Sequence, residues 1–381
     1  MSELEIPIQR ALIDSLTVFI PLNEIVIIDP RITAETVIYY PDLKDWDDLL
    51  SPPTPLRIET GSGITFRVNL VQFPNENFKR LRLVITTKYL REQYFEGIKM
   101  SNLDTVVDTI NAHEAIFITR DVLLSSYCND VDVCSNYHAP IDAYKKCLNI
   151  MHDKVKVSAK NQSVLFNGKG SPDNYGLQFG DRDSGSVRHP FVKWYNKYEE
   201  LITKSATFYN IFLHPHLKYQ RESIKNLRRR ECTVKNARVK DWLQKNCGID
   251  SKMKTFKDWL ELPQQDLETI FRVLPQRYYE KILYQPSDKL SPTDSWISYT
   301  MHELILNGHD TTTILAMCNK TIIACKVQRS RFKKKLERLL TGVLEHGQIF
   351  DLEKENQPVN EFLTAQNLWD IQPKKLITDV Q

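Results

Sequence analysis

Runs of strand length dominate the chain up to about residue 250, and this pattern most constrains the fold. The runs are rich in β-branched and aromatic residues and are separated by Pro and Gly, as is typical of strands joined by turns. The expected strands cover residues 25–28, 36–40, 64–70, 81–87, 129–134, 175–179, 188–194 and 226–236. Helices are expected at residues 103–115, 140–151 and 237–246, and a polar connection at 160–173. The elements predict an α+β unit in which helices flank an antiparallel sheet.

Beyond about residue 250, only helical periodicity remains. The expected helices cover residues 256–260, 265–273, 277–283, 296–307, 311–317 and 321–344. We therefore predict an α+β domain over residues 1–250, a smaller all-helical domain over 251–345, and a polar tail over 346–381.

Composition is that of an ordinary globular protein, with 41% hydrophobic and 26% charged residues. No run of apolar residues is long enough to span a membrane, and acidic residues precede the first apolar segment, which is the wrong order for a secretory signal. The 7 cysteines are scattered without metal-binding spacing. These features predict free thiols and a location in a cytoplasm.

Basic residues are strongly clustered, although the net charge is only +3. Residues 218–240 contain 9 Lys or Arg against 2 acids, and residues 320–338 contain 8 against 1. One such cluster is often a solvated helix face, but two in one chain favour nucleic-acid binding. The residues predicted to contact DNA are Lys333, Lys334, Lys335, Arg228 and Arg230.

The segment 180–197 combines a tyrosine, nearby cations and several Gly and Ser residues. Tyr195 is followed two positions later by Lys197, and Arg182 lies upstream. A tyrosine can attack a DNA phosphate through its phenolic oxygen when cations hold the phosphate. Taken alone, the segment also fits a basic strand with alternating aromatic residues.

Phosphodiester cleavage by a tyrosine also calls for a divalent cation, and Mg²⁺ or Mn²⁺ prefers oxygen ligands. Asp132 lies in an expected strand, and Glu231 begins another one directly after three arginines. Arg229 shares a strand face with Glu231, which can pair a carboxylate with a guanidinium. Each acid could equally be a solvent-facing strand residue or part of an ordinary ion pair.

Several segments resemble the tyrosine replication initiators of rolling-circle plasmids and filamentous phages, the filamentous-phage gene II type in particular. Residues 179–184 and 191–197 are similar to the segment of that family in which Gly, Arg and Ser precede Tyr-x-Lys. Weaker likenesses follow in the same order along the chain, at residues 12–16, 130–132, 227–231 and 304–310.

The resemblance implies an enzyme that nicks one strand of a circular duplex at its origin, becomes linked to a 5′ phosphate, and later rejoins the displaced strand. It implies that Tyr195 is the nucleophile and Lys197 a cation beside the phosphate. It further implies metal carboxylates at Asp132 and Glu231 and supporting cations at Arg182 and Arg229. Its expected partners are duplex and single-stranded origin DNA, with a host helicase and polymerase.

Alternatives remain at each level. Tyr198 could be a second nucleophile, although a packing role is favoured. His214-Pro215-His216 has the His-x-His form of another class of nicking enzyme, but Pro is poorly tolerated within a sheet, and a loop is expected. The main functional rival is a non-catalytic, sequence-specific DNA-binding protein such as a phage or plasmid repressor. RNA binding is less favoured, since no RNA-binding motif is present.

Overall fold

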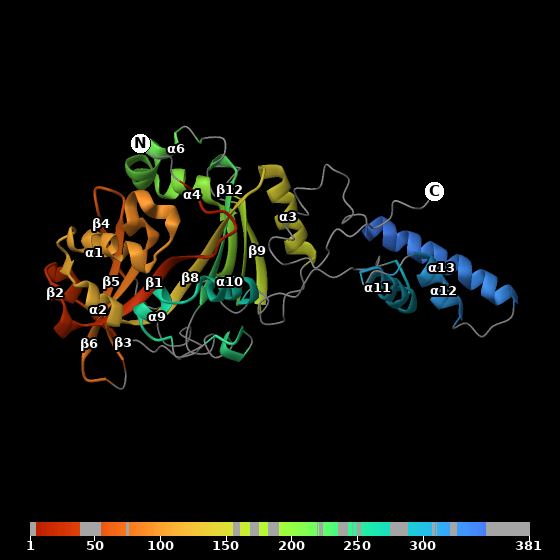
Figure 1. The fold of residues 1–381 in the computed structure, drawn as a ribbon, viewed down its shortest axis with the longest axis horizontal. Helices are drawn as coiled ribbons and strands as arrows, with labels where there is room; N and C mark the ends of the chain where they lie inside the picture. Colours follow the sequence, from red (N-terminus) through yellow and green to blue (C-terminus); the bar gives the residue numbers. More distant parts are fainter. Residues whose placement is uncertain are drawn as a thin grey trace. The chain divides into compact units, whose positions relative to one another are not determined.

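The structure, a computed structural model, contains a large sheet with helices and a further group of helices nearer the C-terminus (Figure 1). It describes residues 5–38, 55–73, 76–154, 161–167, 175–181, 190–218, 220, 224–234, 243–245, 247–249, 253–274, 289–306, 309, 311–320 and 326–347. The chain divides into two compact units, of which the first comprises residues 1–152 and 157–280 and the second residues 153–156 and 281–381. The division lies later than the predicted boundary at residue 250.

A sheet of 10 strands is the centre of the first unit within the described ranges. Its strands are β1 (Leu12–Pro21), β3 (Thr36–Ile38), β4 (Leu56–Glu59), β5 (Thr65–Gln72), β6 (Lys79–Thr86), β8 (Tyr127–His138), β9 (Asn161–Asn167), β10 (Tyr175–Asp181), β11 (Pro190–Asn196) and β12 (Leu227–Val234). The order is β3-β5-β6-β1-β8-β12-β11-β10-β9, and β4 also pairs with β5. The β3–β5 pair is parallel and every other pair is antiparallel, so the structure confirms the predicted α+β class.

The two faces of this sheet differ in chemistry. Val18 lies opposite Leu83, which in turn lies opposite Val68, and all three are fully or almost fully buried. Because paired residues point to the same side, these residues define an apolar face. The other face carries polar side chains on the same strands, and it includes the residues of the candidate site. We call it the polar face.

Shorter elements surround the sheet in the first unit. A pair of short strands, β2 (Val26–Ile27) and β7 (Ile116–Phe117), forms a separate sheet. The helices described are η1 (Leu22–Glu24), η2 (Pro30–Thr33), η4 (Thr87–Glu96), η5 (Met100–Asn102), α1 (Leu103–Asn111), α2 (Arg120–Ser125), α3 (Ile141–Lys154), α4 (Lys197–Lys204), α5 (Ala206–Phe208), η7 (Tyr209–Leu213), α6 (His214–Leu217), α9 (Phe256–Leu260) and α10 (Gln264–Val273).

Helices α9 and α10 belong to the first unit rather than to the predicted helical domain. The backbone N–H of Cys128 donates to the carbonyl of Lys254 at 2.7 Å, and that of Phe256 donates to Ser126 at 2.9 Å. Arg230 of β12 donates to the carbonyl of Phe271 in α10 at 2.8 Å. These bonds attach both helices to the sheet.

The second unit contains α11 (Pro292–Leu306), α12 (Thr311–Lys320) and α13 (Lys326–Gly347), which lie together in Figure 1. Its core is a compact cluster of apolar side chains from the three helices, namely Met301, Ile314, Leu336, Leu339, Leu340 and Val343. Several basic residues of α13, namely Arg331, Lys333, Lys334 and Arg338, are exposed, as helical periodicity predicts for the side away from the apolar cluster, whereas Lys335 is half-buried. Among the described residues, no helix is long and apolar enough to cross a membrane.

Most predicted elements are confirmed, with shifted ends. The strand predicted at 25–28 shortens to two residues, and that at 129–134 lengthens to Tyr127–His138. The predicted polar connection at 160–173 contains β9, and the predicted loop around His216 is helical. The predicted helix at 277–283, the proposed tail beyond residue 347 and most of the predicted helix at 237–246 lie outside the described residues.

Candidate active site

The candidate site is built from β11 and β12, which place four polar side chains next to one another on the polar face. Lys193 lies opposite Glu231, and Tyr195 lies opposite Arg229. Alternation along each strand points all four to the same side. The antiparallel register therefore brings together residues that are distant in the sequence, as the separation of 36 positions between Tyr195 and Glu231 shows.

Tyr195 is the centre of this group. Its hydroxyl donates a hydrogen bond to one oxygen of Glu231, while Lys193 forms an ion pair with the other oxygen. The ammonium of Lys197 donates to the Tyr195 hydroxyl at 3.2 Å. The phenolic oxygen thus lies between a carboxylate that can accept its proton and a cation that can stabilise the resulting phenolate.

The junction between β11 and α4 positions Lys197. Asn196 ends the strand and caps the helix, because its side chain accepts a hydrogen bond from the N–H of Glu199 at 3.3 Å. Lys197 is consequently the first residue of α4 and forms an ion pair with Glu200 at 2.8 Å, one turn later. The Tyr-x-Lys pattern seen in the sequence is thus a strand end followed by a helix start.

Arg229 is held by residues that the sequence patterns do not single out. Its guanidinium forms an ion pair with Asp14 at 2.8 Å and donates to the side-chain oxygen of Asn136 at 2.9 Å. Asp14 also accepts a hydrogen bond from Thr87 at 2.8 Å. In the sequence, Asp14 stands next to Ser15 inside an otherwise apolar run. A polar residue in such a run usually has a bonding partner when it is half-buried, and this was the one sequence feature that could have indicated its role.

Tyr94 and Lys193 complete the surroundings of Tyr195. The Tyr94 ring lies below two cations, with Lys197 at 5.1 Å and Arg229 at 5.5 Å from its centroid. Lys193 lies 5.4 Å from the centroid of Tyr195. Lys193 precedes Tyr195 by two residues, so the strand alternation already placed it on the same face, although it was not among the predicted site residues.

Burial and charge set the protonation states. Burial, and next the Glu231 carboxylate, raise the pKa of Tyr195 well above its usual value, although Arg229 opposes them. Burial and the Arg229 cation both lower the pKa of Lys197. The Glu200 carboxylate, the largest of the opposing effects, helps to leave the pKa of Lys197 raised overall. In the resting site Tyr195 is therefore a neutral phenol and Lys197 a full cation.

The two carboxylates predicted to bind a metal have other partners. Asp132 accepts hydrogen bonds from Ser15 and Thr233, each at 2.6 Å, and Glu231 is engaged by Tyr195 and Lys193. No group of three or more His, Cys, Asp or Glu side chains suited to a metal ion occurs among the residues that the structure describes. An ammonium on the carboxylate that contacts Tyr195 does not fit a bound cation, so we derive no step through a metal.

Arg228 and Arg230 do not fit the predicted role of contacting DNA. Both are 1% exposed and lie on the side of β12 away from Tyr195. Arg228 stacks over the ring of Tyr144 in α3, and Arg230 stacks over Phe271 in α10 at 3.8 Å. The three-arginine run therefore divides between the two faces of the strand, and only Arg229 reaches the site.

The remaining predicted residues either do not belong to the group around Tyr195 or lie outside the described ranges. Arg182 lies outside the described residues. Lys333, Lys334 and Lys335 lie on α13, where the first two are exposed and Lys335 forms an ion pair with Asp294 at 2.5 Å. Tyr198 packs edge-on against Tyr209, with ring centroids 6.2 Å apart. The contact of Tyr198 with Tyr209 is therefore a packing contact.

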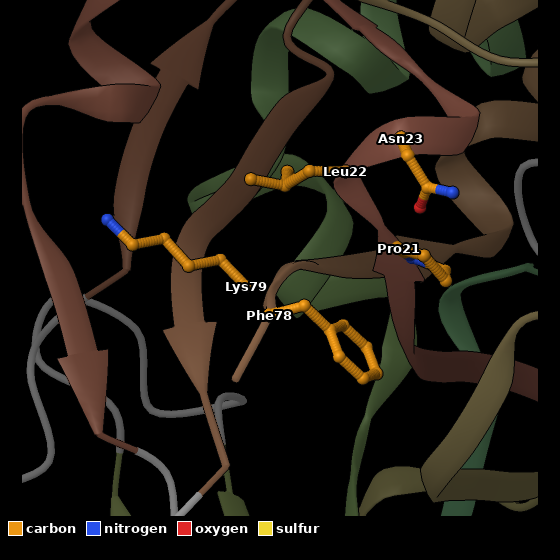
Figure 2. Close-up of a pocket in the computed structure, with 5 residues that line it drawn as sticks. All are labelled: Pro21, Leu22, Asn23, Phe78 and Lys79. Atoms are coloured by element: carbon orange, nitrogen blue, oxygen red, sulfur yellow. The ribbon is translucent and has the colours of Figure 1, made fainter. Parts of the chain in front are cut away.

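A cavity of about 470 Å³ lies at the opposite end of β1 from Asp14 (Figure 2). It is lined by Pro21, Leu22, Asn23, Phe78 and Lys79. None of these residues belongs to the group around Tyr195, so this pocket is not the site of the chemistry suggested by the side chains.

Comparison with known proteins gives one weak structural likeness. No protein-family profile matches the sequence, and no curated protein is significantly similar to it. A solved structure of a rolling circle replication initiator protein from Geobacillus stearothermophilus is 11% identical, with 74% of this chain and 89% of that chain covered, at a TM-score of 0.31. A likeness of this size establishes neither a shared fold nor a shared function.

Proposed function

We propose that the chain is a DNA strand-nicking and strand-joining enzyme of the rolling-circle initiator class, with Tyr195 as its nucleophile. The observation that carries this proposal is the position of the phenolic oxygen, which contacts Glu231 and lies 3.2 Å from the ammonium of Lys197. A tyrosine that only packs in a core does not need both a proton acceptor and a cation at its oxygen.

In the proposed reaction, the phenolic proton passes to Glu231 as the oxygen attacks the phosphorus of the DNA backbone. The bond from phosphorus to the 3′ oxygen breaks, so the 5′ side becomes linked to Tyr195 through its phosphate. The other side leaves as a 3′ hydroxyl after its oxygen takes a proton from solvent water. Lys197 stabilises the phenolate, and Arg229 adds positive charge opposite Tyr195. Attack by a 3′ hydroxyl on the phosphotyrosine reverses the step and joins the strand.

The site in its present form is closed. Tyr195 is 8% exposed, Lys197 is 3% exposed and Arg229 is 1% exposed, so a phosphate reaches the oxygen only after local movement. Burial, and next the charge of the Glu231 carboxylate, keep the phenol protonated until that movement occurs, because they raise the pKa of Tyr195. Nicking is therefore expected to depend on DNA binding rather than to proceed on any accessible phosphate.

Covalent trapping tests the proposal directly. The protein is incubated with a library of random single-stranded oligonucleotides and with supercoiled plasmid, with Mg²⁺ or Mn²⁺ and without metal, and then denatured with SDS. We expect a DNA-linked protein whose modified peptide contains Tyr195, and no such product from Tyr195→Phe. Absence of any adduct overturns the proposal and favours a non-catalytic DNA-binding protein. An adduct on another residue of the wild type overturns the assignment of Tyr195 as the nucleophile.

A further inference from the structure

Arginines from three neighbouring strands share the polar face with Tyr195. Arg57 of β4 lies directly opposite Arg67 of β5, which lies opposite Val84 of β6. Arg82 precedes Val84 by two residues and therefore points the same way. The register continues from this strand across the sheet to the site, through the pairs Thr86–Ser15, Ser15–Asp132, Asp132–Thr233 and Glu231–Lys193.

The like charges of these arginines repel one another. Like charges directly opposite on adjacent strands destabilise a sheet, and Arg57 and Arg67 are such a pair. Burial is the first cause that lowers the pKa of Arg67, and Arg57 and Arg82 lower it further, against the opposing effects of Tyr89 and Asp132. Arg57 is exposed and the other two arginines are half-buried, so all three remain at the surface.

Aromatic side chains accompany the arginines on this face. Phe19 lies opposite Arg82. The centroid of its ring lies 5.4 Å from that of Phe73 and 5.8 Å from that of Tyr127. Arg80 lies over the rings of both Phe73 and Phe78. Phe78 is 47% exposed and also lines the pocket at this end of the sheet (Figure 2).

We propose that this arginine–aromatic face, defined by Arg57, Arg67, Arg82, Phe73 and Phe78, binds single-stranded DNA and leads it toward Tyr195. Cations that follow a backbone, combined with aromatic rings on which unpaired bases stack, are the chemistry of single-strand binding. Stacking requires free base faces, which a duplex does not offer, so the single strand is the favoured ligand. The part of this inference that concerns Tyr195 rests on the proposed function, whereas the binding itself does not.

Salt dependence tests the arginines. Binding of a fluorescent single-stranded oligonucleotide is measured by anisotropy at several salt concentrations, in a Tyr195→Phe background so that no covalent product forms. For a single strand, each phosphate that the protein no longer neutralises reduces the slope of log affinity against log salt by about 0.7. The triple variant Arg57→Gln, Arg67→Gln, Arg82→Gln should therefore reduce the slope by about 2.

A matched triple variant controls for net charge. Arg31→Gln, Lys99→Gln and Arg120→Gln also remove three positive charges from the first unit, but each of these residues is an exposed partner in an ion pair, with Asp29, Glu96 and Asp104 respectively. We expect this variant to keep the wild-type slope. Equal slopes in the two triple variants overturn the inference.

A single substitution and a crosslink keep the test valid if the triple variant fails to fold. Arg57 is exposed on a short strand, so Arg57→Gln should fold and still flatten the slope by about 0.7. Phe78→Ala should weaken binding by about tenfold without changing the slope, since stacking releases no counterions. Bromouridine-substituted DNA should crosslink to residues 56–59, 65–73 or 78–86 of the wild type, and crosslinks confined to α13 overturn the inference.

The two proposals fail in different ways. If the face binds DNA with the expected slopes but SDS traps no adduct, the arginine–aromatic face is a nucleic-acid surface and the nicking proposal is wrong. If an adduct forms on Tyr195 while the triple variant binds like the wild type, nicking stands and DNA approaches by another surface.

Discussion

Asp14 and Arg229, 215 residues apart in the sequence, form an ion pair at 2.8 Å across the centre of the sheet. Asp14 lies on β1 and Arg229 on β12, with β8 between them, and Asn136 of β8 binds the same guanidinium. The strand that opposes Tyr195 is thereby fixed to the N-terminal strand. Through Arg229, this ion pair links the strand beside the candidate nucleophile to β1.

Breaking the Asp14–Arg229 ion pair should greatly lower the free energy of unfolding. Arg229 is 1% exposed, so Arg229→Met should lower the free energy of unfolding by about 3–5 kcal/mol, because it leaves the Asp14 carboxylate without its counter-charge. Asp14→Asn in the same background should recover part of that loss. Urea unfolding of the two single variants and the double variant measures the coupling, and additive effects would contradict it.

Much of the fold was predictable from the sequence, but strand β1 was not. Residues 12–21 form a mostly apolar run of which seven residues are buried, so the alternation that indicates a half-buried strand is absent. The strand β9 falls within a predicted connection because the surrounding residues are polar. Strand pairing between distant segments, such as β1 with β8, has no local signature at all.

The candidate site was also predictable only in part, because its assembly depends on strand pairing. Tyr195, Lys197, Arg229 and Glu231 each have a local pattern, and the structure brings all four together. Period-two alternation alone does not say which face of β12 turns toward the tyrosine of β11, so the sequence predicts DNA contacts for its two other arginines, which the structure buries. Asp14 became recognisable as a partner of the site only when the register was known.

Tyr195→Phe should remove covalent DNA linkage while DNA affinity stays within about twofold, since the variant loses only the oxygen that we propose as the nucleophile. The variant also removes a hydrogen bond to Glu231, which keeps its ion pair with Lys193, so the fold should be retained. Gel analysis after SDS denaturation measures the adduct, and Tyr198→Phe is the control. Transfer of the adduct to Tyr198 would contradict the assignment.

The Lys197–Glu200 pair should make the free energy of unfolding decrease at acidic pH. Burial raises the pKa of Glu200, but the Lys197 ammonium, with smaller effects of Lys88 and Ser205, outweighs burial and leaves this pKa lowered from 4.5 to about 2. A depressed folded-state pKa gives stability that is complete above pH 4.5 and is lost as pH falls toward 2. Urea midpoints measured across this range should fall less steeply in Glu200→Gln, and identical pH profiles would show that the pair contributes nothing.

A metal requirement remains a prediction, and the carboxylates provide its test. If Asp132 and Glu231 bind a cation during nicking, Asp132→Asn and Glu231→Gln should each slow cleavage by orders of magnitude and EDTA should stop it. If Glu231 acts only as proton acceptor, Glu231→Gln should slow cleavage, whereas Asp132→Asn and EDTA should not. His214→Ala with His216→Ala is the counter-test, and complete loss of cleavage by that folded variant would favour the His-x-His alternative.

The basic helix α13 and Arg229 should affect DNA in different ways. Lys333, Lys334 and Lys335 belong to the second compact unit, where two of the three side chains already have acidic neighbours, Glu337 and Asp294. Neutralising all three should flatten the salt slope by up to about 0.9 per phosphate contact on duplex DNA, with specific and non-specific sequences weakened alike.

The rate of adduct formation at saturating protein should then stay unchanged, because these lysines supply binding and not chemistry. Arg229→Lys keeps the charge but loses the planar guanidinium that binds Asp14 and Asn136 together. It should slow adduct formation even when all DNA is bound, with little change in the slope. An unchanged slope in the triple-lysine variant would show that α13 is an ordinary solvated helix, whatever the role of Arg229.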